Sequence, residues 1–209
     1  MGAGRRQPAA AALRRRLRDN GPVSTEPNTE PVAAQRLLPR RIGMLVTAAV
    51  VALALDIVTK ALVVAKLEGK PPLELAGGLV YLDVIRNPYA AFSLGVTGMT
   101  WVFSVICVGV LAAIVWVAPR LRSRGWAVGL GFVFGGALGN LLDRIFRAPG
   151  ALQGHVVDFI SVFGPNAQYF PVFNFADSAI CVGGALIVLM AILGRDYDGR
   201  STREAKTSE

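Results

Sequence analysis

The chain has 209 residues, of which 53% are hydrophobic and only 17% are charged. A soluble domain carries more charge, so this composition excludes an ordinary soluble enzyme and favours an integral membrane protein. The formal net charge of +8 would suit a nucleic-acid-binding protein, but the basic residues lie in short segments that flank apolar runs, as is typical of membrane proteins. We therefore expect no nucleic-acid partner.

Four apolar runs approach or exceed the length of a helix that spans a bilayer, about 17 to 25 residues. In chain order they cover residues 42–67, 99–118, 126–142 and 172–193. The first contains Asp56, Lys60 and Lys66, the second contains no charged residue, and the fourth contains Asp177. The runs predict an all-α integral membrane fold, a bundle of four transmembrane helices.

The basic residues lie mainly on one side of this predicted bundle. Nine arginines precede residue 42, three lie between the second and third runs, and four basic residues follow the fourth run. Apart from Arg144 at the end of the third run, the two other loops hold Lys70, Arg86 and Arg147. Loops rich in lysine and arginine stay in the cytoplasm, so we expect both termini there and the two longer loops outside.

The polar, basic ends predict three parts of the chain. Residues 1–41 and 195–209 are expected to be disordered cytoplasmic tails, although residues 9–18 could instead form a short basic amphipathic helix on anionic lipid. Residues 42–194 are expected to form the four-helix membrane domain. In the first outer loop, residues 79–85 are dense in branched and aromatic side chains, which predicts a small β-rich subdomain outside the membrane. Residues 86–93 are amphipathic and are predicted to lie at headgroup level.

The second outer loop and the third run are rich in glycine. Gly150, Gly154, Gly164 and Pro165 break helices, so the loop is expected to take a re-entrant or surface course. In the third run, glycine recurs every fourth residue, which lets another helix approach closely. These glycines are Gly131, Gly135 and Gly139.

Cysteine and histidine are rare. Cys107 and Cys181 fall within the second and fourth runs, where we expect them to be small apolar packing residues. His155 is the single histidine and cannot build a metal site without several partners. We therefore predict neither a metal nor another cofactor.

Two aspartates lie in apolar surroundings, Asp158 in a loop and Asp177 at the head of the fourth run. Carboxylates at membrane depth are costly, so those that persist usually serve chemistry or transport. Asn174 lies three residues before Asp177 and shares its helical face, although it could simply cap the helix. With the predicted topology, these groups converge near the outer leaflet.

Further polar residues lie at helical spacing. Asn140, Asp143 and Arg144 share one face at the outer end of the third run, where Asp143 and Arg144 could also form a plain interfacial ion pair. Asp56 and Lys60 are four residues apart in the favourable order for an ion pair. That pair is either self-neutralising or a scaffold for a loop or a substrate, and we favour the scaffold.

Together these motifs resemble the signal peptidase II family, also called lipoprotein signal peptidase, over residues 46–193. The motifs are, in chain order, Asp56-x-x-x-Lys60, Arg86-Asn87-x-x-Ala90-Ala91-Phe92-Ser93, Gly135-Gly136-Ala137-Leu138-Gly139-Asn140-Leu141-Leu142-Asp143-Arg144, Val156-Val157-Asp158-Phe159-Ile160 and Phe173-Asn174-Phe175-Ala176-Asp177-Ser178-Ala179-Ile180.

The resemblance implies a multi-pass aspartic endopeptidase of the bacterial inner membrane. Such an enzyme removes the signal peptide from prolipoproteins and cleaves before a cysteine that carries a diacylglyceryl group. The resemblance places catalysis on Asp158 and Asp177, near the outer leaflet. The supporting and substrate-binding residues are Asp56, Lys60, Asn87, Asn140, Asp143, Arg144 and Asn174. We expect a monomer whose partners are lipid-modified prolipoproteins and membrane lipids.

One position departs from the family pattern. The family usually has Asn-x-Gly-Ala-Ala-Phe, whereas this chain has Tyr89 at the glycine position. Glycine allows backbone conformations that are closed to tyrosine. Tyr89 is therefore expected to narrow the substrate pocket, to alter the course of its loop, or to weaken activity.

Two nearby carboxyl groups in a poorly solvated site cannot both ionise easily, so one keeps a proton while the other can activate water. A transporter or proton relay would also use carboxylates at membrane depth, but it would spread them along a path across the bilayer. A non-catalytic membrane scaffold would explain the glycines but not the aspartates. The peptidase interpretation is favoured over both.

Overall fold

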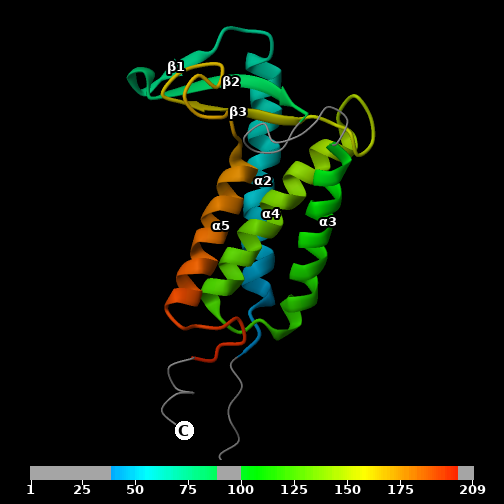
Figure 1. The fold of residues 1–209 in the computed structure, drawn as a ribbon, viewed down its shortest axis with the longest axis vertical. Helices are drawn as coiled ribbons and strands as arrows, with labels where there is room; N and C mark the ends of the chain where they lie inside the picture. The colour runs from blue at the N-terminus through cyan, green and yellow to red at the C-terminus, as the bar shows by residue number, and fades with distance from the viewer. Residues whose placement is uncertain (1–38, 89–99, 202–209) are drawn as a thin grey trace, which may run out of the picture. The chain divides into compact units, whose positions relative to one another are not determined.

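The computed structural model describes residues 39–88 and 100–201, which belong to one unit of the chain, Leu38–Glu209 (Figure 1). Several predictions fall outside the described residues. They are those for Tyr89, for most of the amphipathic segment 86–93, for nearly all of the tail 1–41, and for residues 202–209.

Four long helices form the body of this unit. They are α2 (Ile42–Leu67), α3 (Thr100–Val117), α4 (Arg124–Phe146) and α5 (Phe175–Ile192). All four are long and apolar enough to cross a membrane, which confirms the predicted four-helix fold. Apolar side chains such as Trp116 and Ile192 are 69% and 76% exposed, as expected for surfaces that face lipid.

The helix bounds differ from the prediction by three or four residues at two ends, and by one or two residues at four others. α4 continues to Phe146, four residues past the predicted end, because Asn140, Asp143 and Arg144 are buried against protein. α5 begins at Phe175 and not at residue 172, because Asn174 ends the preceding extended chain as a helix cap.

α4 is the central helix, because half of its most apolar 18-residue stretch is buried, against 11% of the corresponding stretches of α3 and α5. Its glycines explain this position. A Cβ atom at Gly131 would lie 2.6 Å from the carbonyl oxygen of Leu45 in α2, and one at Gly129 would lie 2.9 Å from that of Gly183 in α5. The predicted close approach is therefore confirmed, and it occurs on two faces of α4.

A three-stranded antiparallel sheet caps one end of the bundle (Figure 1). Its strands are β1 (Leu73–Leu75), β2 (Val80–Asn87) and β3 (Val156–Val162), in the order β1-β2-β3. β2 confirms the predicted extended segment, whereas β1 and β3 were not predicted. Asp158 was predicted to lie in a loop; it lies on β3 instead, because Val157 and Phe159 pack with Val63 of α2 and hold this segment as a strand.

The segment after α5 also differs from the prediction of a disordered tail. Residues 195–201 lie against the start of α4, where the indole Nε1 of Trp126 donates to the Arg195 carbonyl oxygen at 2.6 Å. The ring of Tyr197 meets that of Trp126 edge to face at 6.1 Å. The backbone N–H of Arg122 also donates to the Tyr197 carbonyl oxygen at 2.8 Å, so these contacts hold the segment in place.

Candidate active site

β3 aims Asp158 into a cavity because side chains alternate along a strand. Val157 and Phe159 enter the apolar cluster beside α2, so Val156 and Asp158 face the opposite side and line the cavity. The register pairs Asn87 of β2 with Val156. Asn87 is therefore diagonal to Asp158 on the same face, and its Nδ2 donates to Asp158 Oδ2 at 2.7 Å.

The first turn of α5 fixes Asp177. The side chain of Asn174 accepts a hydrogen bond from the backbone N–H of Asp177 at 3.0 Å, and Asp177 Oδ2 accepts from the backbone N–H of Asn174 at 3.2 Å. This reciprocal capping box holds the Asp177 carboxylate at the helix N-terminus, where the helix dipole favours negative charge. Asn174 is thus a helix cap, as one reading of the sequence had it.

Asn174 also contacts the other aspartate. Its Oδ1 is occupied by the N–H of Asp177, so its Nδ2 is directed away from the helix end. That Nδ2 donates to Asp158 Oδ1 at 2.7 Å and to Asn140 Oδ1 at 3.2 Å. One asparagine therefore links the two aspartates, and capping and site geometry depend on the same side chain.

Lys60 fixes the orientation of the second amide. Its ammonium group can only donate, and it lies 3.0 Å from Asn140 Oδ1. The Nδ2 of Asn140 must then face the other way, where it donates to Asp177 Oδ1 at 2.8 Å. Both asparagines consequently present N–H donors to the aspartates.

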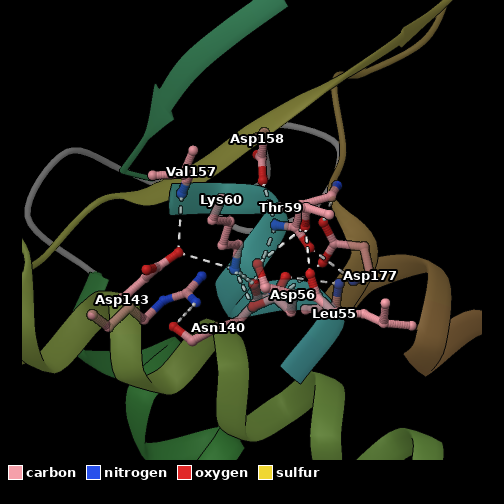
Figure 2. A network of polar contacts seen from close by, with 12 residues as sticks. Leu55, Asp56, Thr59, Lys60, Asn140, Asp143, Val157, Asp158 and Asp177 are labelled. Carbon is pink, nitrogen blue, oxygen red and sulfur yellow. Dashed lines mark hydrogen bonds and ion pairs between the residues drawn. The ribbon is translucent and has the colours of Figure 1, made fainter. Parts of the chain in front are cut away.

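The predicted ion pair of Asp56 and Lys60 is confirmed, and it is part of a larger buried cluster. Lys60 Nζ lies 2.8 Å from Asp56 Oδ2 and 2.9 Å from Asp143 Oδ2, and Figure 2 shows it between these two carboxylates. Asp56 Oδ1 also accepts from the backbone N–H of Ala176 at 3.0 Å. The cluster therefore joins α2, α4 and the start of α5.

Asp143 connects α4 to β3. Its Oδ2 accepts from the backbone N–H of Val157 at 3.2 Å, next to Asp158 (Figure 2). Its Oδ1 forms an ion pair with Nε of Arg147, one turn further along the helix. The sequence reading missed this role of Arg147, although its spacing of four from Asp143 was a usable signal.

Arg144 faces the cavity from α4. Its Nη1 donates to the Asn140 carbonyl oxygen at 3.1 Å, and its guanidinium lies 5.9 Å from the centre of the Phe103 ring in α3. A cation over an aromatic face is favourable when both are shielded from water, and Arg144 is only 5% exposed. α3 therefore contributes to the site by positioning this cation.

A cavity of about 330 Å³ brings these groups together. Five of the predicted site residues line it, namely Asn87, Asn140, Arg144, Asp158 and Asp177. Asn174, Asp56, Lys60 and Asp143 lie behind this lining. The remaining lining residues are mostly apolar and were not predicted to line a site: Val156, Phe170, Pro171, Val172, Phe173, Ser178, Cys181 and Val182. Cys181 is exposed to the cavity one turn after Asp177, so it is not a buried packing residue.

The environment of Asp158 favours its protonated form. Burial, and after it the negative charge of Asp177, raise the pKa of Asp158 to about 7. The amides of Asn87 and Asn174 and the charge of Lys60 act in the opposite direction and only partly offset burial. A carboxyl group with a pKa near neutrality can hold a proton and release it during a reaction.

The formal charges of the site sum to zero when the two cavity aspartates share one proton. The acids are Asp56, Asp143, Asp158 and Asp177, and the basic groups are Lys60, Arg144 and Arg147. One shared proton leaves three negative and three positive charges. A buried cluster of zero net charge is far less costly than one with an excess charge.

This arrangement matches a known group of proteins. The family model described as signal peptidase II matches residues 48–193, a range that contains every residue of the site and leaves out only the two ends of the chain. The chain belongs to the signal peptidase II family. It is therefore an aspartic peptidase and a multi-pass bacterial membrane protein, as four apolar helices also indicate.

Relatives named lipoprotein signal peptidase support the assignment to the signal peptidase II family. One from Rhodococcus jostii is 49% identical over 181 residues, which is 87% of this chain and 85% of the relative. One from Mycobacterium tuberculosis is 48% identical over 167 residues, 80% of each chain. One from Mycobacterium avium is 48% identical over 173 residues, 83% of this chain and 92% of the relative.

Solved structures agree with the fold. A bacterial membrane enzyme determined at 2.3 Å resolution superposes with a TM-score of 0.64 at 29% identity, over 73% of this chain and 90% of that one. A second, at 1.9 Å resolution, gives a TM-score of 0.62 at 29% identity, over 74% and 96%. This signal peptidase II family member thus shares its overall fold with these solved membrane enzymes.

Proposed function

We propose that the chain removes signal peptides from prolipoproteins, with Asp158 and Asp177 as its two catalytic carboxyl groups. The observation that carries this proposal is their placement on one cavity, each held by asparagine amides that the surrounding scaffold orients. Two carboxyl groups that share a proton form the catalytic pair of an aspartic peptidase.

The proposed reaction is direct hydrolysis of the peptide bond. The ionised carboxyl group takes a proton from water, and the water oxygen bonds to the scissile carbonyl carbon. The neutral carboxyl group gives its proton to the carbonyl oxygen. The tetrahedral intermediate then collapses: one of its hydroxyl groups returns a proton to the carboxylate that gave one, the C–N bond breaks, and the proton taken from water passes to the leaving amine.

We assign the resting proton to Asp158 and the charge to Asp177. The raised pKa of Asp158 supports the first assignment, and the capping box at the helix N-terminus supports the second.

The supporting residues have separate tasks in this proposal. Asn140 and Asn174 hold the aspartates at fixed angles, and Lys60 holds Asn140. Arg144 faces the cavity with charge that can bind a substrate carbonyl oxygen. Asp56 and Asp143 keep Lys60 in place, and Asn87 holds Asp158 from β2.

The cavity wall supports a lipid-modified substrate. Apart from the catalytic groups it is lined mainly by apolar side chains such as Phe170, Val172 and Val182, and the helices around it expose apolar faces. We propose that the enzyme takes a prolipoprotein whose cysteine carries a diacylglyceryl group, that the acyl chains remain in the bilayer, and that cleavage occurs before this cysteine.

A reconstituted cleavage assay tests this substrate. Purified protein in bilayers is given a precursor with a diacylglyceryl cysteine and, separately, the same precursor without the lipid, and the products are measured by mass spectrometry. The proposal predicts one product that begins with the lipidated cysteine, and little cleavage of the unlipidated precursor. Cleavage at another bond, or equal cleavage of both precursors, would contradict it.

We also propose that both termini lie in the cytoplasm and that the cavity opens toward the outer leaflet. The excess of basic residues around the termini and in the link between α3 and α4 supports this orientation. A reporter that is fluorescent only in the cytoplasm, fused after residue 209, should fluoresce. A dark fusion of full length would reverse the orientation. The monomeric state stays a prediction.

A further inference from the structure

A second hollow, of about 520 Å³, lies outside the catalytic cavity and shares none of its lining residues. Five residues line it: Arg86, Arg147, Ala148, Pro149 and His155. Two are arginines, one is the only histidine of the chain, and no acidic side chain is among these five. Neither the proposed reaction nor its scaffold gives the hollow a role.

The ends of the apolar helices indicate that the hollow lies at the depth of lipid headgroups. The membrane-spanning helices α2 and α4 end at Leu67 and Phe146. The next residues are Glu68, which pairs with Arg86, and Arg147, which lines the hollow. Phe146, beside Arg147, is 78% exposed, and an aromatic ring in such a position is typical of the membrane–water interface.

Both arginines keep N–H donors for a ligand. Glu68 accepts from Nε and Nη2 of Arg86 at 2.7 and 2.9 Å, on one edge of the guanidinium, which leaves Nη1. Asp143 binds Nε of Arg147, and within the described residues neither Nη of Arg147 has a hydrogen-bond partner. Carboxylates thus hold each guanidinium in position and leave donors directed elsewhere.

We propose that this hollow binds the phosphate group of a membrane phospholipid. Guanidinium groups bind phosphate oxygens through paired, charge-assisted hydrogen bonds. A phosphodiester is the anion that lipids place at this depth, and the exposed Phe146 and the apolar Ala148 and Pro149 suit the glycerol and the start of the acyl chains. Free inorganic phosphate presents the same oxygens, so it is the alternative source of the ligand.

Lipid binding to the delipidated full-length protein in detergent tests the proposal. Native mass spectrometry would count bound dioleoylphosphatidylglycerol across a titration, with dioleoylglycerol as the matched lipid that lacks phosphate. Inorganic phosphate is added in a competing arm. The variants are Arg86→Gln, Arg147→Gln and Arg147→Lys. Lysine at position 147 keeps the charge beside Asp143 but loses the paired N–H donors of the guanidinium group. Arg200→Gln is the control, because Arg200 also pairs with a carboxylate but lies in the segment after α5.

We expect one saturable phosphatidylglycerol per chain and at least about tenfold weaker binding of dioleoylglycerol. Arg86→Gln and Arg147→Lys should each weaken phosphatidylglycerol binding by about tenfold or more, and Arg200→Gln should not. If Arg147→Gln fails to fold, the other two variants decide. Displacement of the lipid by inorganic phosphate at a similar concentration would support a phosphate-binding site in the hollow but would overturn phospholipid as its ligand in favour of free phosphate.

Equal binding of the two lipids, or unchanged binding in Arg86→Gln and Arg147→Lys, would overturn the proposal. The assay measures lipid binding without turnover. Its failure therefore leaves the peptidase assignment untouched.

Discussion

Replacement of Lys60 by methionine tests the buried ion cluster that supports the site. Lys60 is 1% exposed, and its ammonium group lies 2.8 Å from Asp56 Oδ2 and 2.9 Å from Asp143 Oδ2. Methionine has a similar length but no charge, so Asp56 would lose the only cation that the described residues place beside it. Removing one partner of a buried ion pair costs about 3–5 kcal/mol.

That cost sets the expected change in melting temperature. One kcal/mol shifts Tm by about 2–4 °C in a domain of 150–250 residues, so Lys60→Met should lower Tm by on the order of 10 °C. The turnover number should fall as well, because Asn140 loses the donor that fixes its amide at 3.0 Å. Thermal unfolding followed by tryptophan fluorescence in one detergent gives the first quantity, and the cleavage assay gives the second.

Two further variants separate the cluster from a general effect of charge. Lys66→Met removes an exposed lysine from the same helix and should change stability by less than about 0.5 kcal/mol. Asp56→Asn combined with Lys60→Met removes both charges and should recover at least about 1 kcal/mol relative to Lys60→Met alone. A Lys60→Met protein that melts within about 2 °C of wild type would refute this reasoning.

Three other predictions concern the proton, the cap and the helix packing. Because burial raises the pKa of Asp158 to about 7, the folded protein keeps this proton until the pH rises through about 7, and kcat/KM should then fall about tenfold per pH unit on the alkaline side. The unfolded chain loses the same proton near the ordinary pKa of 3.8, so the free energy of unfolding should fall between about pH 4 and pH 7 and level off above that range. A kcat/KM that stays flat from pH 7 to 9 would exclude a protonated Asp158. Asn174→Ser keeps a favoured helix cap but loses the amide donor to Asp158, so kcat should drop about 10- to 100-fold, whereas Tm should fall far less than in Lys60→Met. Loss of folding without a specific loss of kcat would show that Asn174 acts as a cap alone. Gly131→Ala should lower the free energy of unfolding by about 1–3 kcal/mol, because the added Cβ would meet the backbone of α2. The control Gly109→Ala has no atom within 4 Å of the added Cβ, so it should be neutral or slightly stabilising. Equal Tm values for the two variants would contradict close packing of α2 against α4.

The helices could be predicted because their signal is local and strong. The apolar runs predicted the bounds of α2 to the residue, and the largest errors lie at ends that polar side chains decide, after Asn140 in α4 and at Asn174 before α5. β1 and β3 escaped prediction because a three-residue strand carries almost no periodicity and the glycines around β3 suggested irregular chain. The strand that carries Asp158 depends on packing against Val63, which lies 95 positions earlier in the sequence.

The site residues could be predicted individually but their connections could not. The pair of Asp56 and Lys60 lies within one helical turn, so its spacing revealed it. The bond from Lys60 to Asn140 spans 80 positions, and nothing in either motif indicates it. The two-sided use of Asn174, as cap and as donor to Asp158, likewise depends on where β3 lies relative to α5. The expected effect of Tyr89 stays a prediction.

The central claim is that Asp158 and Asp177 together hydrolyse the peptide bond. The direct test is the initial rate of cleavage of a diacylglyceryl-modified precursor by Asp158→Asn and Asp177→Asn, each checked for wild-type Tm, with Asp198→Asn in the segment after α5 as the control. Both site variants should lose at least about 1,000-fold in rate, as expected when an acid or base that acts in the transition state is removed, while the control keeps the wild-type rate. A folded Asp158→Asn or Asp177→Asn protein that cleaves at the wild-type rate would contradict the claim.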